Sequence, residues 1–153
     1  MTQEKYTQYL VKAASYCAYQ ERTQAEVRER LGDWGIYGDD ADLIIAGLIE
    51  ENFLSEERFA KAFAGGKFRV KHWGRNKIRY ELKSRGLSEY CIKVGMAEID
   101  DDEYETALKE LLSKKKHELR TEKNPQILKQ KLARYAIGKG YESSLVWDII
   151  GQI

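Results

Sequence analysis

The sequence contains little proline, cysteine or histidine, and it has no long hydrophobic run. Its 153 residues include one Pro, two Cys and two His. Scarce proline is compatible with long helices, and neither Cys17 nor Cys91 has another Cys or His at metal-ligand spacing. We expect both cysteines to be small buried hydrophobic residues. No stretch approaches the ~20 apolar residues that cross a bilayer, and the N-terminus lacks a secretory signal, so we expect a cytoplasmic protein.

Patterns that carry catalysis or cofactor binding are also missing. His72 and His117 lie far apart, and Gly65-Gly66-Lys67 lacks the spacing and the hydroxyl residue of a phosphate-binding loop. Six acids in residues 98–105 lack the glycine bend of a calcium loop, and we interpret them as acids at a helix start. We therefore predict no catalytic residue, no metal and no cofactor. The protein is expected to act by binding.

One helical pattern occurs three times along the chain. Each copy has an aliphatic residue, a basic residue, two variable residues and Leu, starting at Val27, Ile78 and Leu128, which are 51 and 50 residues apart. Aliphatic residues at i and i+4 lie on one face of a helix. A glycine that can end a helix follows each copy, at Gly35, Gly86 and Gly140. The spacing predicts three copies of one helical unit.

Cap signals and apolar periodicity predict nine helices and no strand. Thr23 with Glu26 is a capping box, Ser88 is an N-cap, and Asn124 precedes Pro125 at a first helical position. The predicted spans are 4–20, 23–33, 39–51, 55–71, 74–85, 88–99, 101–119, 124–138 and 142–152. We predict an all-α fold of three tandem three-helix, helix-turn-helix-like repeats, at 1–54, 55–100 and 101–153. Units of about 50 residues are marginally stable alone, so the repeats should pack into an elongated, curved array.

A net charge of +1 hides a strong segregation of charge along the chain. Residues 67–85 sum to +7, residues 98–105 to −6 and residues 109–139 to +7. In the first basic block, aromatic residues are interleaved with Lys and Arg. This pattern is typical of polyanion-binding surfaces, because cations pair with phosphates and rings stack on bases. The alternative interpretation is a helix face whose charges are only solvated.

Basic side chains are therefore the candidate binding residues. One follows the first aliphatic residue of every copy, and others crowd the second and third repeats. We assign partner or DNA binding to Arg28, Lys67, Arg69, Lys71, Arg75, Lys77, Arg79, Lys83, Arg85, Lys129, Lys131 and Arg134. We expect Arg75, Lys77, Arg79 and Lys83 to be solvated, so that replacing them costs little stability.

The three tryptophans occur once per repeat. They are Trp34, Trp73 and Trp147. Because large rings bury much apolar surface, we expect them in the core instead of in contact with a ligand.

Three segments resemble the RecX family of bacterial recombinase regulators. They are residues 50–60, Trp73-Gly74 with residues 78–86, and residues 132–135 with 139–141. Together they span nearly the whole chain in the family's order. Two positions depart from the family pattern: Arg75 follows Trp73-Gly74 where the family often has Pro, and residues 36–38 lengthen the first-repeat turn. These departures concern the start of one helix and the geometry of one turn.

The resemblance implies a non-enzymatic modulator of the RecA recombinase. Such a protein would lodge along the RecA–DNA filament and restrain ATP hydrolysis, strand exchange and co-protease activity. The implied partners are the RecA filament and, more weakly, the DNA phosphate backbone. We expect a monomer with no membrane partner.

Two other interpretations stay open. Three helix-turn-helix-like units could each place a recognition helix in DNA, but residues 39–51 and 142–152 contain no Lys or Arg. Acidic helices would be repelled by the phosphates that line the major groove. A helical-repeat adaptor would instead bind protein partners without dependence on DNA.

We predict that binding to single- or double-stranded DNA alone is modest and weakens as salt rises. The reason is that it rests on phosphate neutralisation by residues 67–85 and 109–139. Fluorescence anisotropy of labelled DNA across a salt series measures this dependence. An affinity that stays constant from low to high salt contradicts the assignment.

Overall fold

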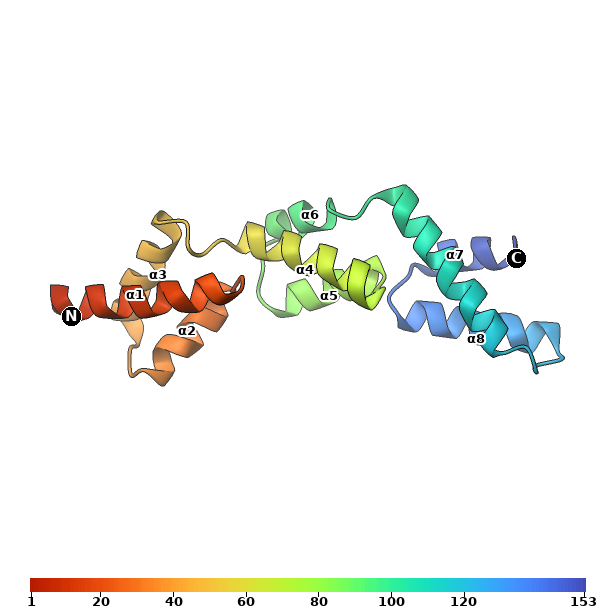
Figure 1. Ribbon diagram of the computed structural model, residues 1–153, viewed down its shortest axis with the longest axis horizontal. Helices are drawn as coiled ribbons and strands as arrows, with labels where there is room; N and C mark the ends of the chain where they lie inside the picture. Colours follow the sequence, from red (N-terminus) through yellow and green to blue (C-terminus); the bar gives the residue numbers. More distant parts are fainter.

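The computed structural model describes residues 1–153, and every regular element in it is a helix (Figure 1). The helices are α1 (Gln3–Tyr19), α2 (Gln24–Asp33), α3 (Gly38–Glu50), α4 (Glu56–Lys71), α5 (Arg75–Ser84), α6 (Glu89–Met96), α7 (Asp101–Glu118), α8 (Pro125–Gly138) and α9 (Ser143–Ile150). The predicted all-α class and its nine helices are confirmed. The largest boundary error is at α6, which was predicted to reach residue 99 and ends at Met96. None of these helices has the length and hydropathy that a membrane crossing requires.

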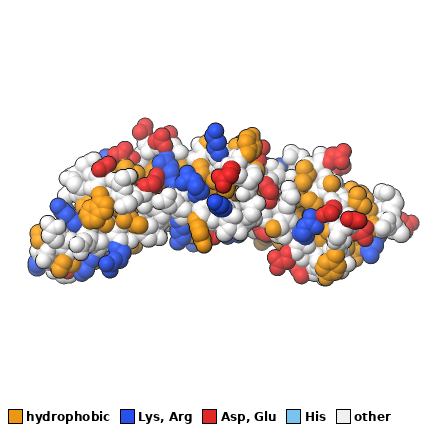
Figure 2. All heavy atoms as spheres, turned by 180° about the vertical axis from the view of Figure 1, so that it is seen from behind, with side chains coloured by type: hydrophobic (Ala, Val, Ile, Leu, Met, Phe, Trp, Pro, Cys, Tyr) orange, Lys and Arg blue, Asp and Glu red, His pale blue; other side chains and the backbone are white.

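Three-helix units follow one another along an elongated body (Figures 1 and 2). Helices α1–α3 lie at one end, α4–α6 in the middle and α7–α9 at the other end, so the termini are far apart (Figure 1). Each repeat contacts only its neighbours, as expected of a tandem array. We keep 1–54, 55–100 and 101–153 as the proposed limits of the repeats.

Local sequence signals set the helix ends as predicted. Thr23 and Glu26 form a reciprocal capping box, the Ser88 hydroxyl accepts from the Cys91 amide at 3.2 Å, and Asn124 caps α8. The glycines that follow α2, α5 and α8 have φ angles of 80°, 84° and 106°, at Gly35, Gly86 and Gly140. This left-handed conformation strains any residue with a Cβ, so glycine ends each second helix.

The first repeat has a core of its own. Ten buried residues form it: Ala13, Cys17, Val27, Leu31, Ile36, Ala41, Ile44, Ile45, Leu48 and Leu54. Helices α1 and α3 pack closely, and a Cβ added at Gly47 of α3 would lie 3.1 Å from the Leu10 side chain of α1. The cluster ends at Leu54, immediately before the second repeat begins.

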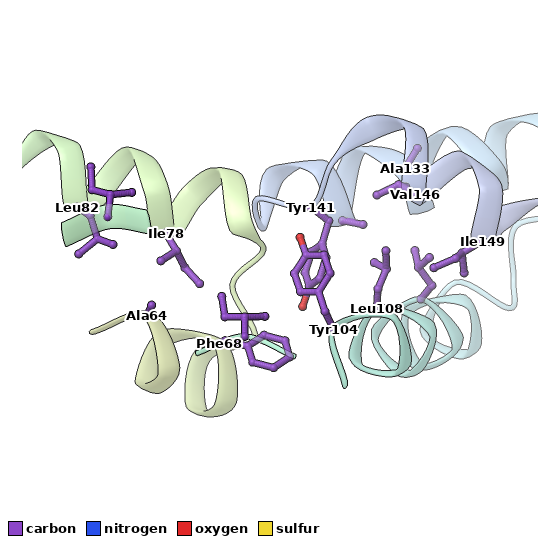
Figure 3. Close-up of a cluster of buried hydrophobic side chains, with 14 of the residues drawn as sticks. Ala64, Phe68, Ile78, Leu82, Tyr104, Leu108, Ala133, Tyr141, Val146 and Ile149 are labelled. Carbon is purple, nitrogen blue, oxygen red and sulfur yellow. The ribbon is translucent and has the colours of Figure 1, made fainter. Parts of the chain in front are cut away.

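The second and third repeats share a single core of 19 buried residues. Figure 3 shows Tyr104 and Tyr141 between side chains of the second repeat, such as Phe68, and those of the third, such as Leu108. The rings of Tyr104 and Tyr141 stack with their centroids 4.9 Å apart. The ring centroid of Phe68 lies 5.8 Å from that of Tyr104. The two repeats therefore form one structural unit.

Backbone-to-backbone contact closes the junction between these repeats. The Gly74 amide donates to the Lys139 carbonyl at 2.8 Å, and the Asn76 amide donates to the Gly140 carbonyl at 2.9 Å. A Cβ added at Gly74 would overlap the carbonyl carbon of Gly140 and the amide nitrogen of Tyr141. The start of α5 and the end of α8 can meet this closely only because neither glycine carries a side chain.

The contact between the first and second repeats is polar and centres on Arg58. Its Nε donates to the two carboxylate oxygens of Glu21 at 2.9 and 2.8 Å, and its terminal nitrogens donate to the Asn52 and Phe53 carbonyls, each at 3.1 Å. The Gln24 amide donates to Glu56 at 3.0 Å. One arginine thus fastens α4 to the end of α1 and to the linker after α3.

Two predictions about burial need correction. Cys17 is buried, but Cys91 is only half-buried. Trp34 and Trp73 are half-buried against the two cores, whereas Trp147 is 43% exposed. On α9 the inner face is taken by Val146, Ile149 and Ile150, which leaves Trp147 on the outer face.

We predict that Gly74→Ala destabilises the protein by about 1–3 kcal/mol, the usual cost of overfilling a tight contact. Thermal or denaturant unfolding measures the change. The matched control is Gly66→Ala in α4, where nothing lies within 4 Å of an added Cβ. Removing a helix-interior glycine there should stabilise by about 0.5–1 kcal/mol. Equal stability of the two variants would contradict the close approach at Gly74.

Candidate nucleic-acid interface

Three predicted basic residues gather around two aromatic rings in the second repeat. Lys67 comes from α4, Lys77 from α5 and Arg85 from the end of α5, and they surround Phe63 and Trp73. We call these five residues the Trp73 cluster. Lys67, Lys77 and Arg85 were predicted as binding residues and Trp73 as a core residue, and the fold brings them together around Phe63.

The cations lie over the ring faces of the cluster. The Nζ atoms of Lys67 and Lys77 lie 4.9 and 4.4 Å from the centroid of the Trp73 ring. Both positive charges are therefore held at the same ring. The guanidinium carbon of Arg85 is 4.9 Å from the centroid of Phe63. Phe63 itself meets Trp73 edge-on at 6.3 Å. The rings hold the cations in place through their negative faces.

The end of α4 explains why the cluster forms. Phe63 and Lys67 are four residues apart on one helix face. His72 then ends the helix in a left-handed conformation, with φ 60°. That turn folds Trp73 back beside Lys67 and starts α5, which supplies Lys77.

The two lysines of the cluster have no carboxylate partner. Neither Lys67 nor Lys77 makes an ion pair, and Arg85 lies 4.0 Å from Glu81, at the limit of a salt bridge. Both lysines are half-buried, which weakens the screening of their charges by water. Concentrated positive charge without a counter-charge attracts an anion, and phosphate groups of nucleic acid fit this chemistry.

An exposed aromatic side chain extends the cluster along α5. Tyr80 is 70% exposed and lies three residues from both Lys77 and Lys83, so the three side chains are neighbours on the helix surface. A ring in this position can stack on an unpaired base while the lysines pair with phosphates. The sequence prediction did not single out Phe63 or Tyr80, although their spacing from Lys67 and Lys77 was visible.

Arg75 is not solvated, and that expectation was wrong. Its side chain is only 21% exposed, because it forms ion pairs with Asp101 and, at 3.6 Å, with Glu142. Its guanidinium carbon lies 4.0 Å from the centroid of Tyr104. Arg75 therefore bridges the second repeat to the starts of α7 and α9 in the third.

A tyrosine hydroxyl completes this bridge. The Arg75 amide donates to the Tyr104 hydroxyl at 2.9 Å, and that hydroxyl donates in turn to Glu142. Burial, together with the hydrogen bond to Glu142, raises the pKa of Tyr104, so the hydroxyl stays protonated. Burial also raises the pKa of the adjacent Tyr141 to about 12. A proline at position 75 would have no amide hydrogen to donate, so the arginine suits this junction.

The remaining predicted residues lie outside the cluster. Arg28 pairs with Asp42 at 2.8 Å, Lys131 pairs with Glu122 at 2.9 Å, and Arg69 donates to the Glu98 carbonyl at 3.4 Å. The exposed residues without an ion pair are Lys71, Arg79, Lys83, Lys129 and Arg134. Figure 2 shows basic side chains over the middle and C-terminal parts of one face, interrupted by acidic ones. The basic residues thus form separate patches and not one continuous surface.

A groove beside the cluster-bearing helix carries mixed charge. It is about 400 Å³ and lies between the end of α4 and the first half of α7. Arg69 and His72 face it from one side, and the acids Asp102, Glu103 and Glu110 from the other. No three His, Cys, Asp or Glu side chains are arranged to hold a metal ion. The acids make this groove a poor site for DNA.

Comparison with known families matches two parts of the chain. Residues 55–95 match the model described as the second three-helix domain of RecX, and residues 101–150 match the third. The chain is 36% identical over 135 residues to the regulatory protein RecX of Clostridium perfringens, strain 13. That alignment covers 86% of this chain and 62% of the relative. The regulatory protein RecX of Lactobacillus johnsonii is 30% identical, over 92% of this chain and 52% of the relative.

Solved structures share the fold. The crystal structure of RecX from Lactobacillus salivarius superposes with a TM-score of 0.88, covering 99% of this chain and 97% of that one, at 18% identity. A second crystal structure, described as regulatory protein RecX, gives a TM-score of 0.81 at 21% identity, over 94% of this chain and 73% of that one. The three-repeat arrangement is thus a known architecture.

We predict that Arg75→Gln lowers the free energy of unfolding by about 2–4 kcal/mol, because it leaves Glu142 and the Tyr104 hydroxyl without their cationic neighbour. Lys83→Gln, on the exposed face of the same helix, should change it by less than about 0.5 kcal/mol. Denaturant unfolding of both variants provides the comparison. A stability of Arg75→Gln equal to that of the parent protein would remove Arg75 from the junction.

Proposed function

The chain belongs to the RecX family of regulatory proteins, and on this basis we propose that it binds the RecA recombinase filament on DNA and restrains its activity. It would act without catalysis, by occupying the filament and slowing ATP hydrolysis, strand exchange and co-protease action. Because the proposed partner is the filament, we place this activity in the cytoplasm and expect a monomer to carry it. The chain spans 62% of the length of the first curated relatives it matches, so these activities are proposals for this chain.

The Trp73 cluster is the observation that carries the proposal. Lys67 and Lys77 lie over the Trp73 ring without a carboxylate partner, and the exposed Tyr80 is their neighbour. Such a surface suits a phosphate backbone with accessible bases. We propose that Lys67, Lys77 and Arg85 contact DNA phosphates within the filament. The exposed Arg79, Lys83, Lys129 and Arg134 would add weaker phosphate contacts.

Charge favours this proposal over a sequence-specific DNA reader. In each repeat the third helix would be the recognition helix, but α3 and α9 contain no Lys or Arg. In the second repeat the concentrated charge belongs to α4 and α5, and it lies over aromatic rings. Cations arranged in this way neutralise phosphates and carry no base-edge code.

The test is the DNA-stimulated ATP hydrolysis of the cognate RecA as this chain is titrated. We predict that the double variant Lys67→Gln, Lys77→Gln requires about tenfold more protein for half-inhibition, because two phosphate contacts are lost. Its stability should fall by less than about 2 kcal/mol, since only cation–ring contacts are removed.

The matched control is the double variant Lys61→Gln, Lys93→Gln. Both lysines are exposed in the same repeat but lie outside the cluster, and the change in net charge is the same. If the two double variants inhibit equally, the cluster has no special role. If the parent chain leaves ATP hydrolysis unchanged at saturation, the proposed function itself is wrong.

A further inference from the structure

The first repeat has the opposite charge to the second. Residues 1–54 contain five Lys or Arg and ten Asp or Glu, a net charge of −5, whereas residues 55–100 contain eleven and six, a net charge of +5. The first repeat also packs around its own core and has its own surface. A unit of this charge is repelled by a phosphate backbone, so its surface suits a different ligand.

An apolar groove lies open on this acidic repeat. It is about 390 Å³, and it runs between one side of α1 and the segment that follows α3. Five of its seven lining residues are hydrophobic; the seven are Leu10, Val11, Ala14, Ser15, Ala18, Glu51 and Phe53. Val11 is 61% exposed and Phe53 is 41% exposed. Several apolar side chains gathered in one groove form a surface that a partner can cover.

The groove continues outward from the core of the first repeat. Helix α1 places Ala13 and Cys17 in the core and packs Leu10 and Ala14 against it, while Val11 and Ala18 are exposed on the outer side of the helix. Ala14, Ser15 and Ala18 are small lining residues that let another backbone approach closely, and Phe53 forms one wall. Val11 and Ala18 thus add apolar surface that the first repeat itself does not bury.

The charge at the groove selects its occupant. Glu51 is the charged residue in the lining, Glu50 precedes it, and neither forms an ion pair. Apolar surface beside uncompensated carboxylates complements a protein segment that carries apolar side chains and a Lys or Arg. DNA offers neither feature.

We propose that this groove binds a RecA subunit directly, through an apolar segment whose Lys or Arg pairs with Glu51. This inference rests on the proposed function and assigns its protein contact to the first repeat. The Trp73 cluster then contacts DNA, and the groove contacts protein, so the chain bridges the two components of the filament. Each contact is small, and linking them in one chain raises the overall affinity through effective concentration.

The experiment compares two ligands with the full chain: DNA-free RecA and a DNA oligonucleotide without RecA, both followed by biolayer interferometry. Val11→Glu and Glu51→Lys should each weaken binding to DNA-free RecA at least fivefold. Neither should weaken binding to DNA, and Lys67→Gln with Lys77→Gln should show the reverse pattern. Leu43→Glu is the matched control, since Leu43 is 55% exposed on α3 of the same repeat and does not line the groove.

Each outcome decides one of the two proposals. Parent-like RecA binding by folded Val11→Glu and Glu51→Lys overturns the groove proposal while leaving the proposed function intact. Self-association of the parent chain that Val11→Glu abolishes, seen by analytical ultracentrifugation, overturns it as well, because the occupant is then a second copy. A parent chain that neither binds RecA nor slows its ATP hydrolysis overturns the proposed function and the groove proposal with it.

Discussion

The close approach of the backbone at Gly74 and Gly140 is the constraint on which the second and third repeats depend. Amide groups there donate directly to carbonyls of the other repeat, and no Cβ fits at Gly74. Because the start of α5 is fixed against the end of α8, Tyr104 and Tyr141 stack and fill the space beneath it. The same fixed point holds Trp73, one residue earlier, in the position where Lys67 and Lys77 reach its ring. Stability and the candidate DNA surface therefore share one origin.

Neighbouring cations at this junction have different roles because of their surroundings. Arg75 meets the acids at the starts of α7 and α9 and holds the repeats together. Lys77, two residues later, meets a ring and no carboxylate, and its charge remains available to a ligand. Net charge along the sequence could not distinguish them. The acidic segment 98–105, which we interpreted as helix-start acids, supplies Asp101 to this bridge as well as the N-cap Asp100 of α7.

Most of the fold was predictable because its signals are local. The capping box at Thr23, the N-caps at Ser88 and Asn124, and the glycine stops act within a few residues, and together with apolar periodicity they placed all nine helices. The candidate site was predictable only as a list of cations. The Arg75 bridge joins residues 26 and 29 positions apart, and Tyr141 reaches the His72 carbonyl across 69 positions. Such pairings, like the outward position of Trp147, depend on how the repeats dock.

Polar groups alone hold the contact at Arg58 between the first and second repeats. Four of its hydrogen bonds, to Glu21, Asn52 and Phe53, are partly exposed, so water can replace them one for one. No apolar core crosses this point, whereas one core unites the other two repeats. A body that is rigid throughout can follow a helical track at only one pitch. Under the proposed function, a chain that opens at this contact would keep its basic part on the DNA while its acidic end adjusts to a filament that stretches or tightens.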